Sequence, residues 1–273
     1  MARAPVGTFA DVSQEDEVRI PGERGTERLE QKMDATEAAN RSAEAIVGLP
    51  AGFMMDRATY ERGSELGFDG VDFYVAGRGG ALGDVCGAVV AATFVFFNPD
   101  TVCEAWDRSA KVMSRAEAAA AFAACSVSWA DAHLGDEVEY ANLAELAGEV
   151  IQNASPAGLA LFAGWSEVEE PTQGKALALH RLNVLRELRG SLHGAAVISR
   201  GIEPRTAVMI SAPHMAPILG WSEPHLDPEP ARTKWKEAEA ATDLAMGQRL
   251  SALEPGQRSK FVELCAAVLS ARK

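Results

Sequence analysis

Residues 180–193 carry the side chains best suited to bind a small molecule. If one helix runs through this segment, Arg186, Arg189 and His193 share one side of it, because they are spaced at i, i+3 and i+7. Arginine offers a planar fork of N–H donors that fits a carboxylate or a phosphate. Together with Arg78, which lies in a glycine-rich segment, these residues predict a cationic pocket for an anionic or carbonyl-bearing ligand.

His180 and Glu187 would share another side of the same helix, at i and i+7. Catalysis by proton transfer needs a group tuned to the working pH, so the candidate catalytic groups are His193, His180 and Glu187. The structural alternative pairs Glu187 with an arginine and holds two helices together, because an unpaired buried charge is costly. The sequence leaves open whether a reaction is catalysed. It identifies no cofactor, and its five histidines lack the spacing of a metal site, so no metal is expected.

The overall charge disfavours nucleic acid as a partner. The formal net charge is −13 and the sequence pI is about 4.9. Proteins bind a phosphate backbone by matching it with lysine and arginine, so this chain repels DNA at long range unless its cations gather on one face. No apolar run reaches the length of a membrane span or of a signal-peptide core. We therefore expect a cytoplasmic protein with no membrane contact.

Composition and pattern predict a mainly α protein, a multi-helix bundle. Alanine, the best helix former, is abundant, and no run alternates convincingly between apolar and polar residues. Ser114 and Glu117 have the spacing of a capping box, and Asn98-Pro99 is typical of a helix start. The apolar run 89–97 fits a buried strand or a helix, and its helical neighbours favour the helix. The expected helices include 34–47, 51–66, 84–97, 114–133, 136–153, 175–188, 191–200, 204–211, 231–253 and 255–271.

Glycines crowd the segment 77–83, at positions 77, 79, 80 and 83. A glycine-rich loop at the start of a helix can bind phosphate through its backbone N–H groups. However, no strand is expected before this segment, and the spacings of the phosphate-binding and dinucleotide-binding loops are absent. We therefore expect a tight corner in which glycine supplies a positive φ.

The chain divides into three expected parts. Residues 1–31 hold many charged and few apolar side chains, which predicts a mobile acidic tail. Residues 32–155 are expected to form an N-terminal helical domain, ending near Ser155-Pro156. Residues 156–273 are expected to form a C-terminal helical domain, in which five prolines between positions 213 and 230 mark an irregular connection.

Four segments resemble those of an actinobacterial family of helix-turn-helix or winged-helix-like proteins. The runs FYVAGRGGALG at 73–83 and VVAATF at 89–94 are similar to the family patterns F-A-G-R-A-A-P-L-G and V-V-T-A-T-F. LRELRGSLH at 185–193 is similar to L-R-E-H-R-G-D-G-H, and Gly220-Trp221 matches a later G-W. The resemblance covers roughly residues 34–271. It implies a degenerate winged-helix-like C-terminal part and a transcriptional regulator that binds DNA, with a homodimer left open.

The chain departs from this family where function is expected. Leu188 stands in place of a histidine, and Ser191-Leu192 in place of Asp-Gly. The stretch 222–232, where relatives carry a recognition-like helix and a wing, is short, proline-rich and acidic. A helix that reads DNA needs lysine or arginine beside its base-contacting side chains. The leading interpretation is therefore a small-molecule-binding or small-molecule-transforming protein. The alternatives are a DNA-binding regulator and a structural or interaction protein.

Overall fold

The computed structural model describes residues 33–172 and 174–273. Within them the chain forms twelve α-helices and no β-strand, so the predicted mainly α class is confirmed. The expected tail, 1–31, lies outside the described residues. The helices are α1 Ala35–Met54, α2 Arg57–Glu65, α3 Asp72–Gly79, α4 Gly87–Thr93, α5 Pro99–Ser109, α6 Arg115–His133, α7 Tyr140–Asn153, α8 Ala160–Ser166, α9 Gly174–Ser199, α10 Pro204–Ser211, α11 Arg232–Leu250 and α12 Pro255–Ser270, with 3-10 turns at Gly80–Leu82, Pro213–Met215 and Glu229–Ala231.

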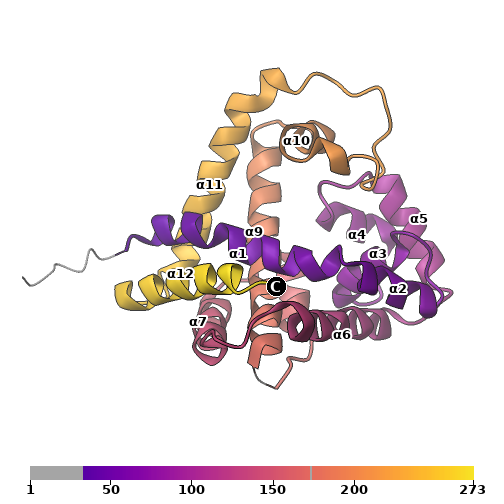
Figure 1. Cartoon of the computed structure of the whole chain (residues 1–273). Coiled ribbons are helices and arrows are strands. Elements are labelled where there is room, and N and C mark those ends of the chain that lie inside the picture. Colours follow the sequence, from indigo (N-terminus) through magenta and orange to yellow (C-terminus); the bar gives the residue numbers. More distant parts are fainter. Residues whose placement is uncertain (1–32, 173) are drawn as a thin grey trace, which may run out of the picture. The chain divides into compact units, whose positions relative to one another are not determined.

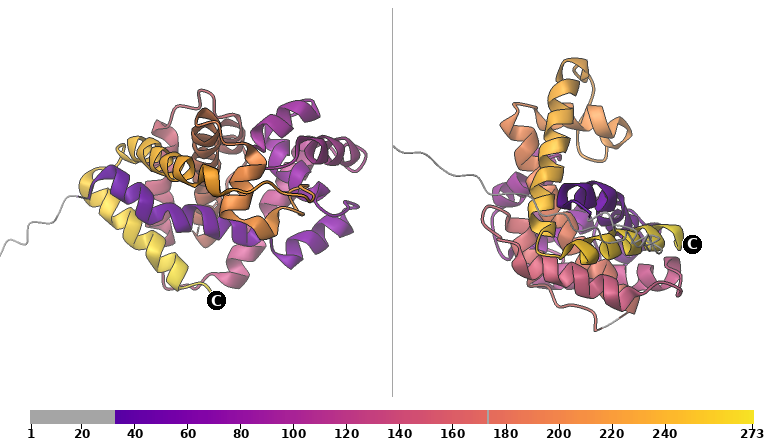
Figure 2. Two further views of the ribbon diagram at one scale, coloured as in Figure 1. Left: turned by 90° about the horizontal axis from the view of Figure 1, so that it is seen from above. Right: turned by 90° about the vertical axis from the view of Figure 1, so that its left-hand side faces the viewer.

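Helix α9 is the centre of the bundle (Figure 1). It packs against α1, α6, α7, α8 and α11, and most of its side chains from Ala176 to Arg189 are buried. Helix α1 lies between α11 and α12 (Figure 2). The expected domain boundary at 155 falls between α7 and α8, and helices from both sides of it contribute to one hydrophobic core.

No single helix in the described ranges is both long and apolar enough to cross a membrane. By length and composition alone, the pair Asp72–Leu82 and Gly87–Thr93 reaches that threshold, with a bend of 94° between its halves.

Two expected helix ends are wrong, because packing overrides local sequence. The predicted break at Gly190 is absent, and α9 runs on through it. Apolar residues on both sides of Gly190, such as Leu188 and Val197, are fully buried, and their burial outweighs the roughly 1 kcal/mol that a glycine costs inside a helix. Likewise α1 continues through Pro50, whose neighbours Leu49 and Phe53 are fully buried.

Other local signals are confirmed. Ser114 and Glu117 form the predicted capping box of α6, and the Asn98 side chain caps α5 by accepting the Asp100 N–H. The expected helix 84–97 is wrong at both ends: α4 spans Gly87–Thr93, and residues 94–97 continue as a turn.

The glycine-rich segment is not the positive-φ corner that we expected. Gly77, Gly79 and Gly80 have helical backbone, and within the segment only Gly83 has a positive φ, of 75°. The glycines are needed for close packing instead. A Cβ on Gly77 would lie 2.4 Å from the Cβ of Phe122 in α6, and a Cβ on Gly80 would lie 2.3 Å from the Arg115 carbonyl oxygen. Glycine therefore allows α3 to approach α6 closely, which fixes the position of Arg78.

Two helical glycines provide a matched test of this packing. Gly77→Ala should lower the free energy of unfolding by about 1–3 kcal/mol, because the new methyl group meets Phe122. Gly190→Ala should raise it by about 0.5–1 kcal/mol, because nothing lies within 4 Å of the new Cβ and alanine favours the helix. Urea unfolding measures both. Destabilisation by Gly190→Ala would show that the helix does not continue through this position.

Candidate functional site

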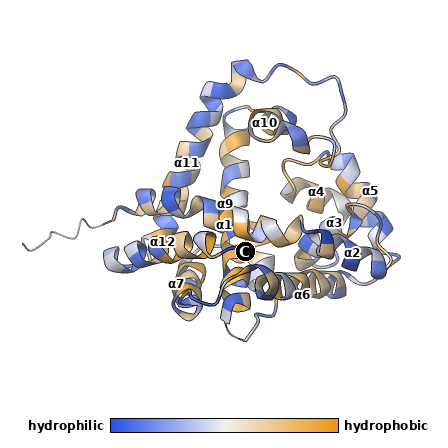
Figure 3. Ribbon diagram, in the orientation of Figure 1, coloured by the Kyte–Doolittle hydropathy of each residue, from blue (hydrophilic) through white to orange (hydrophobic). Residues whose placement is uncertain are grey.

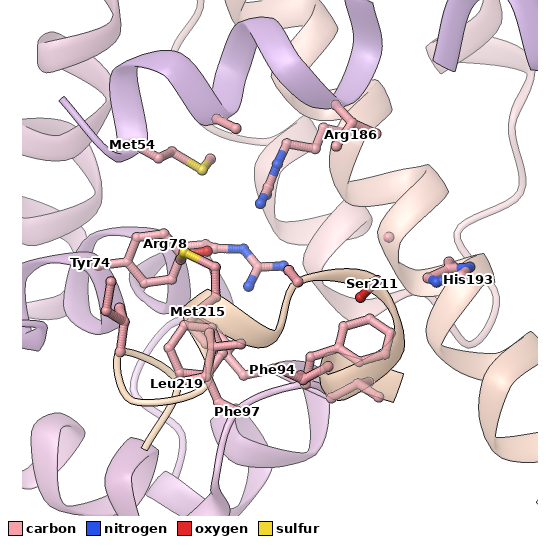
Figure 4. A pocket seen from close by; sticks show the side chains of 18 of the residues that line it. Met54, Tyr74, Arg78, Phe94, Phe97, Arg186, His193, Ser211, Met215 and Leu219 are labelled. Atoms are coloured by element: carbon pink, nitrogen blue, oxygen red, sulfur yellow. The ribbon is translucent and has the colours of Figure 1, made fainter. Parts of the chain in front are cut away.

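A cavity of about 500 Å³ opens between α1, α3, α9 and the segment from α10 to Leu219 (Figure 4). The start of α11 and the turn after α4 complete its wall. A cavity of this size is within the usual range for small-molecule sites. Arg78, Arg186, Arg189 and His193 all line it, so the structure brings the four predicted ligand-binding residues to one cavity.

Most of the cavity wall is apolar. Tyr74 and Phe97 stack with ring centroids 5.5 Å apart, and Phe94 meets both rings edge-on at 6.0 and 5.4 Å. Met54, Met215 and Leu219 line the same space (Figure 4). Because these rings pack on one another, the wall is formed before any ligand arrives.

The Arg78 guanidinium is bound by Glu187. Its Nε donates to Oε1 of Glu187 at 2.9 Å, and its Nη2 donates to Oε2 at 2.8 Å. The guanidinium carbon also lies 4.4 Å from the centre of the Phe94 ring. Burial alone would lower the pKa of Arg78, but Glu187 and Tyr74 raise it above the ordinary value. Arg78 is therefore charged, and its Nε and Nη2 donors are both bound to Glu187.

Arg186 shares the same carboxylate. Its Nη1 donates to Oε1 of Glu187 at 2.7 Å. Burial would raise the pKa of Glu187, but Arg78 and Arg186 lower it below the ordinary value, so this acid is ionised. The structural alternative weighed from the sequence, a pairing of Glu187 with arginine that joins two helices, is thus present between α3 and α9. It coexists with the cavity.

Arg189 and His193 turn towards α11. Nη2 of Arg189 donates to Oδ1 of Asp243 at 3.0 Å and lies 3.6 Å from a carboxylate oxygen of Glu239. Nδ1 of His193 lies 3.0 Å from the Thr242 hydroxyl oxygen. That hydroxyl donates its proton to the Ala238 carbonyl, so His193 must be the donor through Nδ1.

His193 therefore directs Nε2 at Glu239, 3.7 Å away. Burial lowers the pKa of His193, although Glu239 opposes this shift. A neutral His193 leaves an unprotonated Nε2 on the cavity wall.

The other two candidate catalytic groups are poorly placed for proton transfer. His180 is only 2% exposed and does not line the cavity; it lies beside Trp165, and burial lowers its pKa. Glu187 is fully buried and bound by two arginines, which hold it ionised. Of the three candidates, His193 alone lines the cavity with a free lone pair.

Several buried polar atoms lack a hydrogen-bond partner among the described residues. They include Nε of Arg186 and Nε of Arg189, both on the cavity side of α9, and both amide atoms of Asn183. A buried donor without a partner costs about 1–3 kcal/mol. The two arginine Nε groups have almost no accessible surface, so a ligand in the cavity would meet the outer N–H groups of these arginines instead.

Sequence reasoning missed the aromatic wall and the segment 208–219. The aromatic residues of the run 89–97 have the pattern of ordinary core residues. No sequence signal near Met215 and Leu219 indicates that they line the same cavity. Only the tertiary structure shows that the segment 208–219 lines the cavity.

The site and fold define a helical protein with a partly open, largely apolar cavity that has one charged wall. A helix-turn-helix family matches residues 36–233, from α1 to the first residues of α11. The chain belongs to this helix-turn-helix family. No curated protein matches the chain, and no solved structure matches it either.

The buried ion pairs generate a prediction about stability. Glu187→Gln removes the carboxylate that two buried guanidiniums share, so the free energy of unfolding should fall by about 3–5 kcal/mol. Glu237→Gln is the matched control, because Glu237 pairs with Arg200 at the surface and such pairs contribute less than about 1 kcal/mol. Denaturant unfolding of both variants makes the comparison. Equal effects would mean that the Arg78–Glu187–Arg186 cluster does not stabilise the bundle.

Proposed function

We propose that this protein binds a small organic molecule in the cavity between α1, α3, α9 and the segment 204–219. The observation that carries the proposal is the composition of the cavity wall: an aromatic and aliphatic surface with a few convergent polar groups. Small-molecule sites have this composition, since apolar contact supplies affinity and a few polar groups fix orientation.

Binding is better supported than catalysis. A nucleophile needs a neighbouring group that activates it. A general base must lie within hydrogen-bond reach of the proton that it accepts. Glu187 is held ionised by two arginines and His180 is off the cavity, which leaves His193 alone among the candidates. A single histidine facing a carboxylate supports no particular reaction.

Filling the cavity tests the proposal. Ala51 of α1 lines it, so Ala51→Phe should weaken ligand binding by tenfold or more, whereas Ala51→Ser keeps the volume and should bind as the parent does. Thermal shift and calorimetry with a panel of apolar acids, amides and alcohols provide the measurement. A panel that leaves the melting temperature of the parent unchanged would favour the third interpretation, in which the charged cluster is purely structural.

A second function, DNA binding, is favoured by the family match. That match supports a transcriptional regulator more directly than it supports a ligand-binding protein. One pair of helices has the required local geometry: α10 follows α9 after the four-residue connection 200–203, which contains Gly201 at φ 65°. Helix-turn-helix motifs join their helices by a turn of this length, often with glycine.

The charges near this helix pair are mixed. Arg205 of α10 is bound by the Ser222 and Pro224 carbonyls and by His225, so it is not free to contact phosphate. Hydrophilic residues predominate along the first half of α11, including the exposed Lys234 and Lys236 (Figure 3). These lysines are exposed cations on a helix that contacts α10, against an overall charge of −13.

Fluorescence anisotropy with the region upstream of its own gene tests DNA binding. If the protein binds DNA, Lys234→Gln with Lys236→Gln should weaken binding to all duplexes and reduce the slope of log K against log salt by about two. Lys111→Gln, in an exposed turn after α5, is the control. Absence of binding at low salt would exclude this function and agree with the expectation from charge.

A further inference from the structure

One end of the charged wall of the cavity, formed by Arg78, Glu187 and Arg186, carries an excess of one positive charge. Arg78 and Arg186 share the single carboxylate of Glu187. Among the described residues, the charged groups that shift the pKa of Glu187 are these two arginines, and no second acid acts on Arg78. Two guanidiniums and one carboxylate leave a net charge of +1.

This charge is largely removed from water. The side chains of Arg78, Arg186 and Glu187 are 11%, 18% and 1% exposed. A buried ion without a counter-ion is strongly unfavourable, and the aromatic rings beside Arg78 supply none. The empty hydrogen-bonding position is on Arg186, because Glu187 takes both Nε and Nη2 of Arg78 but only Nη1 of Arg186. Nη2 of Arg186 forms no hydrogen bond among the described residues and, unlike Nε, is not a buried atom.

We propose that the ligand is an apolar monocarboxylate whose carboxylate binds Arg186 and whose body lies against Tyr74, Phe94 and Phe97. This inference rests on the proposed ligand-binding function and specifies its ligand. The carboxylate supplies the missing negative charge and an acceptor for Nη2 of Arg186, while the stacked rings bury the apolar body.

The end of the charged wall near Arg189 disfavours a ligand that carries a second carboxylate. There Arg189 faces two carboxylates, those of Asp243 and Glu239, which leaves a net charge of −1 beside a neutral His193. A second anionic group on the ligand would meet this negative charge. The two ends therefore select a ligand that is charged at one end only.

Matched probes test the charge of the ligand. Decanoate is compared with decanamide and with the dicarboxylate decanedioate, and 2-naphthoate with 2-naphthamide, by calorimetry at neutral pH. A hydrogen bond to a charged group contributes roughly 1.5–3 kcal/mol, so each monocarboxylate should bind about tenfold to a hundredfold more tightly than its amide. Decanedioate should bind more weakly than decanoate.

Variants assign the effect to Arg186. Arg186→Gln should remove the preference for carboxylate over amide, and the variant should fold, because a neutral Arg78–Glu187 pair remains. Retained amide binding reports that the cavity is intact. Arg200→Gln, directly after the same helix and outside the cavity, should keep the preference. A preference that survives Arg186→Gln would overturn the assignment to this residue.

The outcomes separate the inference from the function on which it rests. If amides bind as tightly as carboxylates, the charge inference is wrong while the ligand-binding function stands. If neither class binds, the proposed function fails and the inference fails with it.

Discussion

Glu187 joins α3 to α9 inside the bundle, and both the stability and the chemistry of the cavity depend on that contact. Its carboxylate accepts hydrogen bonds from Arg78 and Arg186 while fully buried. In this environment each ion is tolerated only because the others are present. The cluster fixes the charged wall of the cavity beside the aromatic wall, where the Arg78 guanidinium contacts the Phe94 ring. The structural and the ligand-binding interpretations of this cluster are therefore compatible. The same three side chains connect α3 to α9 and leave an excess positive charge at the cavity.

The position of the cluster depends in turn on close helix packing. Glycines at 77 and 80 let α3 lie against α6 at distances that no side chain would allow. The uninterrupted α9 carries Arg186, Arg189 and His193 at spacings that face one cavity. A break at Gly190 would have separated His193 from the arginines. The site is thus a consequence of one continuous helix and one unusually close contact.

Membership in a helix-turn-helix family and the cavity point to different partners. The family match covers most of the bundle, yet the helix pair α9 and α10 carries few free cations. A fold supports many functions, and the groups at the site decide between them. In this chain, the most specific chemistry lies inside the cavity rather than on the surface of α10.

The sequence by itself determined the helical class, the caps of α5 and α6, and the four charged or histidine residues that line the cavity, Arg78, Arg186, Arg189 and His193. These follow from local propensity and spacing, which neighbouring residues encode. Only the tertiary structure decided that α9 runs through Gly190, that Glu187 binds two arginines, and that the segment 208–219 returns to the cavity. Each of these depends on burial and on contacts between distant parts of the chain, where packing energy exceeds the local preferences that a sequence pattern reports.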